Sequence, residues 1–168
     1  MKKIWVLFTL VSFLVIIEAC KKDEVPEGAL NDKDLFNLIE KQNYSFYKGN
    51  DSRLPGANPN AHGSHIRTLF NPIAQSALDS NGVLPSNATF PDSSIVLKEV
   101  FDGENGPFKL YAVMMKLPNH PNQSGGWIWS EYEEDGKTII SIADKGNQCL
   151  SCHSAVDNRD LVRTFAFH

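Results

Sequence analysis

SIVLKEVFDGENGPFKLYAVMMKLPNHPNQSGGWIWSEYEEDGKTIISI, residues 94 to 142, is the part of the sequence that most strongly indicates the fold class. It contains four short runs rich in β-branched, aromatic and other apolar residues, at 94–101, 108–117, 127–132 and 137–142. Segments of Gly, Pro, Asn, Asp and Glu, most of which favour turns, separate the runs. Short strands in such close order indicate an antiparallel meander, in which each strand pairs with the next.

The chain before this stretch supplies flanking elements. Asn31 is a suitable N-cap, and apolar residues at helical spacing predict a helix from 32 to about 47. Alternation at 65–70 predicts a strand, and Asn71-Pro72 predict the start of a short helix that ends near 78. Residues 49–63 and 79–88 are turn-rich and predict loops. The expected fold class is therefore α+β, mainly an antiparallel β-sheet (a meander) with flanking helices.

The N-terminus has the pattern of an exported bacterial lipoprotein. Lys2 and Lys3 precede an apolar run at 4–17, which suits a signal peptide and is shorter than the ~20 residues of a membrane span. The run ends in Ile17-Glu18-Ala19-Cys20, which resembles a lipobox, where cleavage exposes the Cys20 thiol for lipidation. The charged residues that follow resemble the tether of Bacteroidota lipoproteins. Cleavage without lipid and an uncleaved anchor are the alternatives, and both preserve export.

These features predict three regions and a location. We expect a signal peptide at 1–19, a lipidated tether at 20–31 and one domain at 32–168. The protein would be exported and held to the membrane by its N-terminal lipid, in the periplasm or at the outer membrane. The net charge of -4 provides no basic surface for nucleic acid.

The remaining two cysteines lie in Cys149-Leu150-Ser151-Cys152-His153, which has the pattern Cys-x-x-Cys-His. Two thiols on one helical turn can each form a thioether with a vinyl group of a porphyrin, and the next residue places an imidazole under the iron. The sequence therefore predicts one covalent haem c, bound by Cys149 and Cys152, with His153 as the proximal ligand of the haem iron.

Three other interpretations of the cysteine pair stay open. A thioredoxin-like pair would follow an early strand in a βαβ unit, whereas this pair lies near the C-terminus. A zinc site would add His62 and His65 and leave His153 unused. A local disulfide is the third. Small electron-carrier cytochromes c have the motif near their start, and the four-helix cytochromes c' need four long helices where only one is predicted.

Residues from about 62 to 165 resemble the cytochrome P460 family, which includes the β-sheet cytochromes c'. The resemblance implies an antiparallel sheet packed against one haem, an open distal face and a homodimer. The blocks that carry it, in the family's order, are His62-Gly63-Ser64-His65, Asn71-Pro72, Phe90-Pro91-Asp92, Ile95 to Glu99, Tyr111 to Lys116, Gly126 to Trp129, Cys149 to His153, and Asp160.

Two positions carry further implications of this resemblance. P460 enzymes have a bond from a lysine nitrogen to a meso carbon of the haem, and Lys98 matches that lysine. Lys98 shares a strand face with Val96 and Val100, where a buried ion would be costly; the alternative is a lysine that reaches solvent. In hydroxylamine-oxidising members a distal carboxylate follows on the next strand, but ungapped alignment places Ala112 there. An apolar pocket suited to nitric oxide is the expectation.

The main functional hypothesis is thus a monohaem cytochrome of the P460 type with an open iron site that binds or oxidises small nitrogen species such as nitric oxide or hydroxylamine. It would exchange electrons with a partner protein, and whether it is a haem-dependent oxidoreductase is left open. The alternative is a six-coordinate electron-transfer cytochrome c without enzymatic activity. For His62, His65, Met114 and Met115, roles in packing or polar contacts are expected more than ligation.

Overall fold

The computed structural model describes residues 30–154 and 159–168. The predicted signal peptide, Cys20 and most of the predicted tether lie outside these residues. In the parts of the chain that are described, no helix has the length and apolar character needed to cross a bilayer.

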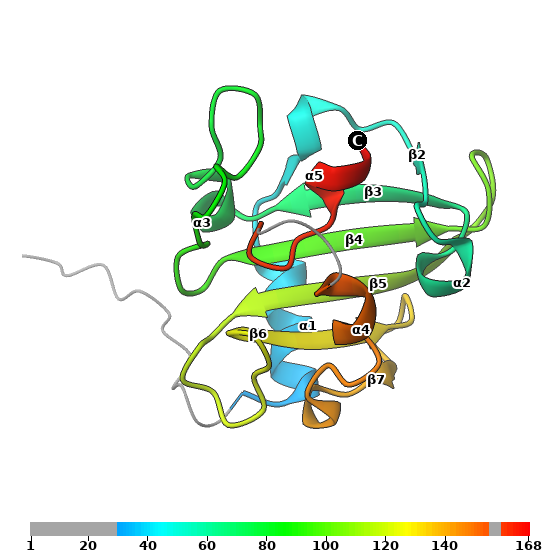
Figure 1. Cartoon of the computed structure of the whole chain (residues 1–168). Helices are drawn as coiled ribbons and strands as arrows, with labels where there is room; N and C mark the ends of the chain where they lie inside the picture. Colours follow the sequence, from blue (N-terminus) through cyan, green and yellow to red (C-terminus); the bar gives the residue numbers. More distant parts are fainter. Residues whose placement is uncertain (1–29, 155–158) are drawn as a thin grey trace, which may run out of the picture.

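The central element is an antiparallel sheet in the order β1-β3-β4-β5-β6-β7, with β2 paired to β3 as well (Figure 1). From β3 to β7 each strand pairs with the next along the chain, so the predicted meander and α+β class are confirmed. The strand bounds are Ser45–Phe46 for β1, Leu54–Pro55 for β2, His65–Phe70 for β3, Ile95–Phe101 for β4, Phe108–Lys116 for β5, Trp127–Tyr132 for β6 and Thr138–Ile140 for β7.

The helices are short except for α1. The bounds are Asp32–Lys41 for α1, Pro59–His62 for α2, Pro72–Gln75 for α3, Leu150–His153 for α4 and Thr164–Phe167 for α5, with 3-10 turns η1 at Tyr47–Gly49 and η2 at Ile142–Asp144. Asn31 caps α1 through a capping box, and Asn71 caps α3, with Pro72 in its first turn. Both predicted N-caps are therefore present.

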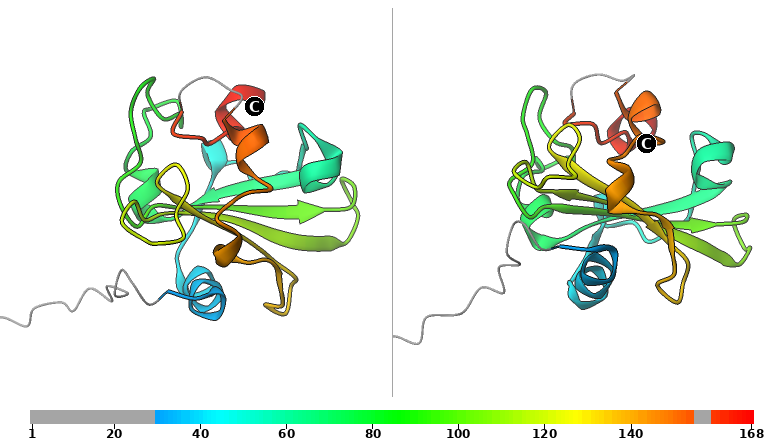
Figure 2. Two further views of the ribbon diagram at one scale, coloured as in Figure 1. Left: turned by 60° about the horizontal axis from the view of Figure 1, so that its bottom comes forward. Right: turned by 90° about the horizontal axis from the view of Figure 1, so that it is seen from below.

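The two faces of the sheet carry different elements (Figure 2). α1 covers one face, where a core of thirteen buried residues includes Leu35, Leu97 and Met115. α4 and α5 lie over the other face, above a second core that includes Val96, Met114 and Trp129. Strand alternation sends neighbouring side chains such as Met114 and Met115 to opposite faces.

The structure corrects three sequence-based boundaries. The helix predicted to end near 78 ends at Gln75, and Ala77 and Leu78 donate to the carbonyls three residues before them. The helix predicted to reach residue 47 ends at Lys41, because Ser45 and Phe46 instead pair with Phe70 and Leu69 of β3. At these residues, pairing with a distant strand outweighs the local preference for helix. The predicted loop at 49–63 contains β2 and α2, the latter started by Asn58, whose side chain accepts a hydrogen bond from the Asn60 N–H.

Candidate functional site

The Cys-x-x-Cys-His residues lie at the start and on the single turn of α4. Cys149 is the N-cap, and the His153 N–H donates to the Cys149 carbonyl at 3.1 Å. The chain reaches α4 by passing over the Trp129 ring at Gly146, whose φ is 65°. A Cβ at Gly146 would lie 2.5 Å from Trp129 Cδ1, so only glycine permits this approach. The two cysteines thus lie on one helical turn, as the haem interpretation of the motif requires.

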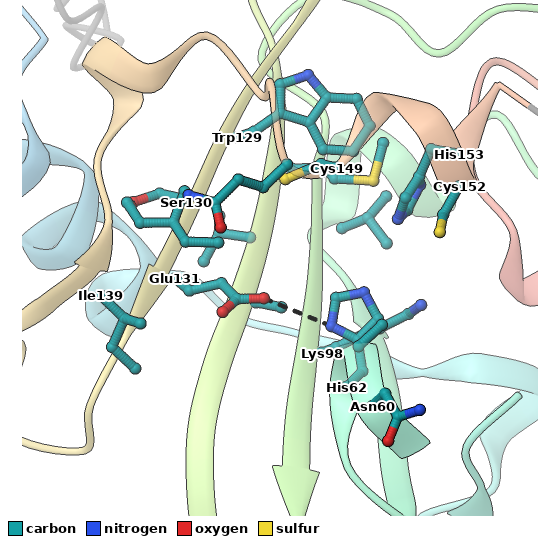
Figure 3. Close-up of a pocket in the computed structure, with 17 residues that line it drawn as sticks. Asn60, His62, Lys98, Trp129, Ser130, Glu131, Ile139, Cys149, Cys152 and His153 are labelled. Atoms are coloured by element: carbon teal, nitrogen blue, oxygen red, sulfur yellow. Dashed lines mark hydrogen bonds and ion pairs between the residues drawn. The ribbon is translucent and has the colours of Figure 1, made fainter. Parts of the chain in front are cut away.

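α4 borders a cavity of about 390 Å³ on the sheet face opposite α1 (Figure 3). Its volume falls within the range of cofactor pockets, ~300–1,000 Å³. All three motif residues line it. So do sheet residues from β4, β5 and β6, together with residues of α2 and β7, among them His62, Val96, Lys98, Ala112, Met114, Trp129, Glu131 and Ile139.

His153 is held as a neutral imidazole with one defined free nitrogen. Its Nδ1 lies 2.7 Å from the Leu161 carbonyl, so Nδ1–H donates and Nε2 keeps a lone pair. Burial, aided by the nearby Lys98 charge, lowers the pKa of His153 from 6.5 to about 4. The Trp129 ring packs edge-on against it, with 4.8 Å between ring centres. A neutral imidazole oriented through its other nitrogen is what an iron ligand requires.

The two cysteines are free thiols, which argues against a local disulfide. Burial raises the pKa of the Cys149 thiol to about 11, the opposite of the shift that activates a thioredoxin-like cysteine. Within residues 30–154 and 159–168, no group of three or more metal-binding side chains is close enough to hold a metal ion. The zinc interpretation with His62 and His65 therefore has no geometric support.

One row across the sheet brings the polar groups of the pocket together. Lys98 of β4 pairs with Ala112 of β5, and Ala112 pairs with Glu131 of β6. Residues in register on neighbouring strands share a face, so the lysine, the alanine and the carboxylate all face the α4 side. The carboxylate that the alignment did not find at position 112 is therefore supplied by Glu131 on the neighbouring strand.

Glu131 and His62 form a pair at the pocket wall. Glu131 Oε1 lies 3.5 Å from His62 Nδ1, and both side chains are largely buried, with 12% and 24% of their area exposed. The prediction of an apolar pocket is therefore wrong in part, because Glu131 and His62 are polar. Glu131 could have been found from sequence: alternation from Trp127 and Trp129 places it on the same face.

Lys98 is half-buried between apolar neighbours, as the strand pattern predicted. It lines the pocket, and none of the described residues forms an ion pair with it. Burial, with the charge of Arg163, lowers its pKa from 10.5 to about 8. The lowered pKa increases the fraction of Lys98 that is an uncharged, nucleophilic amine near neutral pH.

The other residues singled out from the sequence divide by sheet face. Met114 and Trp129 line the pocket, whereas Met115 packs in the core beneath α1. Trp127 is fully buried in the core on the α4 side. His65 does not line the pocket; its Nδ1 lies 3.3 Å from the Ser64 hydroxyl. Met115 and His65 therefore have no position from which to act in the pocket.

The residues present fit a covalent haem: two free thiols on one turn, a buried neutral imidazole with Nε2 available, and a cavity of suitable size beside them. Fold and site together define a class of protein, a small antiparallel-sheet domain with a C-terminal haem-attachment helix. The family model described as cytochrome P460 matches residues 47–164, and the chain belongs to this family. It is accordingly a haem c cytochrome of that kind. No curated protein matches the chain.

Proposed function

We propose that this cytochrome holds its haem through Cys149 and Cys152, uses His153 as the proximal ligand, and takes a small nitrogen species such as nitric oxide or hydroxylamine on the pocket side. Each thioether forms by addition of S–H across a vinyl double bond. The observation that carries the proposal is the imidazole of His153, neutral and fixed by the Leu161 carbonyl, with Nε2 available. Bound there, the haem supplies an iron that binds the ligand and exchanges electrons.

Glu131 supports oxidation of hydroxylamine rather than binding alone. Oxidation of an N–H or O–H compound releases protons, and a positioned base speeds their removal by about 10²–10⁴-fold. Glu131 is the carboxylate that lines the described pocket, and His62 lies 3.5 Å away to share or relay the proton. The chain's own contribution is to bind the substrate and to accept its protons at Glu131.

Glu131→Gln tests this role on protein matured with haem. We expect hydroxylamine-dependent reduction of an electron acceptor to fall by about 10²-fold or more, while nitric oxide binding persists. Glu133→Gln is the matched control, because Glu133 is on the same segment but is paired with Lys137 outside the pocket. Equal rates in the two variants would refute a base at Glu131. Absence of a haem pyridine spectrum in the parent protein would refute the proposal as a whole.

We also propose the bond between Lys98 and the haem. A half-buried amine with a lowered pKa, on the pocket face, supports it. The new N–C bond replaces an N–H and a meso C–H, so its formation requires a two-electron oxidant such as a peroxide. A red-shifted ferrous Soret band that disappears in Lys98→Arg is the expected signature. An unchanged band in that variant would exclude the bond.

A six-coordinate electron-transfer cytochrome is the second candidate, and His62 is the residue that favours it. Its ring centre lies 6.2 Å from that of His153, with the rings edge-on. If His62 is the sixth ligand, the resting spectrum is low-spin and His62→Ala makes it high-spin. The open site predicts a high-spin spectrum in both proteins.

Export and membrane attachment rest on the N-terminal pattern. We propose lipidation at Cys20, with the domain in the periplasm or at the outer membrane, where it exchanges electrons with a partner protein. Labelled fatty acid should enter the parent protein and not Cys20→Ser. The proposed homodimer is tested by the mass of the haem-loaded domain in solution.

A further inference from the structure

Asp160 is a buried acid that no role described so far uses. Only 9% of the residue is exposed. Its carboxylate accepts hydrogen bonds from Lys116 Nζ at 2.6 and 2.9 Å, from the Phe90 N–H at 2.8 Å and from Trp127 Nε1 at 3.3 Å. These donors come from β5, β6 and the connection before β4. Asp160 therefore ties the C-terminal segment to two strands of the sheet and to the connection before β4.

The backbone around Asp160 is held in an unfavourable conformation. Asp160 and Leu161 are consecutive non-glycine residues with φ of 52° and 66°. Such positions are unfavourable for residues other than glycine and persist where the surroundings over-determine them. Here the guanidinium of Arg159 also donates to the Leu84 carbonyl, and Val162 is buried in the core. The strain is thus maintained by contacts on both sides of Asp160.

This backbone conformation aims one carbonyl at the candidate iron ligand. The Leu161 carbonyl accepts from His153 Nδ1 at 2.7 Å, and Leu161 follows Asp160 directly. The turn before β6 leaves room for the arrangement. A Cβ at Gly125 would collide with Leu161 Cδ1, and one at Gly126 would lie 3.0 Å from Lys116 Nζ.

We propose that Asp160 is a positioning residue for His153: its bonds to Lys116, Trp127 and the Phe90 N–H fix the Leu161 carbonyl and so set the strength of the His153 Nδ1 hydrogen bond. A stronger bond at Nδ1 makes the imidazole a better electron donor through Nε2. Electron donation favours oxidised iron, so this network lowers the reduction potential. The inference rests on the proposed function in one respect, the ligand role of His153.

Asp160→Asn, matured with haem, provides the test. We expect its reduction potential to rise and the iron–histidine stretching frequency of the ferrous protein to fall, relative to the parent. Asp102→Asn is the control, because Asp102 is an exposed carboxylate on the β4–β5 turn and should leave both quantities unchanged. An unaltered stretching frequency in Asp160→Asn would overturn the inference.

A charge effect alone could also raise the potential, and a second variant separates the two causes. Asp160→Asn combined with Lys116→Met removes the ion pair as a unit, so the net charge of the pair stays at zero. Positioning predicts that both shifts persist in the double variant. A return to the parent potential would show that charge acts alone and would overturn the inference.

Trp127→Phe covers the case in which Asp160 variants fail to fold. It removes one donor to Asp160 and keeps an aromatic ring against Phe90. We expect smaller shifts of the reduction potential and the stretching frequency in the same directions. The absence of both shifts would contradict the inference. Failure of the proposed function is recognised separately, because the parent protein would then show no haem pyridine spectrum or no change on replacement of His153.

Discussion

At His153, burial and hydrogen bonding act on the imidazole in opposite directions. Desolvation is the larger effect and lowers its pKa, and the Lys98 charge adds to it, whereas donation to the Leu161 carbonyl favours the charged form. The result is a neutral ring at physiological pH with its free nitrogen defined. One side chain thereby meets both conditions for metal ligation, a lone pair and a fixed orientation.

This shift predicts an acid sensitivity of the chain expressed without haem attachment. The pKa of His153 is 6.5 when unfolded and about 4 when folded, so between these values the unfolded state binds more protons. The contribution of His153 to the free energy of unfolding is fully present above pH 6.5 and is lost as the pH falls towards 4. Roughly 2 kcal/mol should be lost between pH 7.5 and 5. Urea unfolding at both pH values should show a smaller loss in His153→Gln, and equal losses would contradict the assignment.

Sequence alone could predict the residues of the site that are adjacent in the chain. Cys149, Cys152 and His153 form a contiguous motif whose spacing determines their chemistry. His62 belongs to the site through α2, which only the tertiary fold brings to the pocket, whereas alternation along β6 is enough to place Glu131 on the pocket face. Lys98 was placed on the correct face because alternation along one strand is enough.

Among the elements, α1 and α3, both capped by asparagine, offer a matched comparison. Asn31 caps α1 at the surface, where its side chain accepts one bond from Asp34 N–H at 3.0 Å. Asn71 caps α3 but is 1% exposed; it also accepts from the Ile95 N–H and donates to the Ser93 carbonyl. The second asparagine therefore joins α3 to the start of β4.

Replacement of each asparagine by alanine should separate capping from buried bonding. Asn31→Ala should lower the free energy of unfolding by about 1 kcal/mol, the usual loss for an exposed cap. Asn71→Ala leaves two buried N–H groups and a carbonyl without partners and should cost about 3 kcal/mol. Chemical denaturation of both variants measures the difference. Losses of equal size would mean that the Asn71 bonds to β4 contribute nothing.

The boundaries that sequence missed belong to elements defined by pairing. The predicted strands at 65–70 and 127–132 match β3 and β6, because alternation in the first and a short apolar run between turn residues in the second are local signals. β1 and β2 have two residues each and exist only through their bonds to β3. Nothing in so short a segment distinguishes it from a helix end or a loop.

Across the whole molecule, one sheet separates the core beneath α1 from the side that holds the pocket. α1 and its core lie on one face, and the pocket with α4 and α5 lies on the other (Figure 2). A large helix-covered face can thus hold the sheet together while the opposite face keeps an open cavity. Ligand chemistry should therefore respond to residues on the pocket face, whereas stability depends on packed residues on both faces.

Met114 and Met115 test this division, because they are adjacent, chemically identical and buried on opposite faces, with 7% and 4% exposed. Each change to alanine should cost about 2–5 kcal/mol of stability, since each leaves a cavity in a packed core. Only Met114→Ala enlarges the pocket, so only this variant should alter the haem spectrum and the affinity for nitric oxide. Unfolding curves and nitric oxide titrations on both variants provide the comparison. Equal changes in affinity would show that the two faces are coupled through the sheet, and that the pocket depends on the core beneath α1.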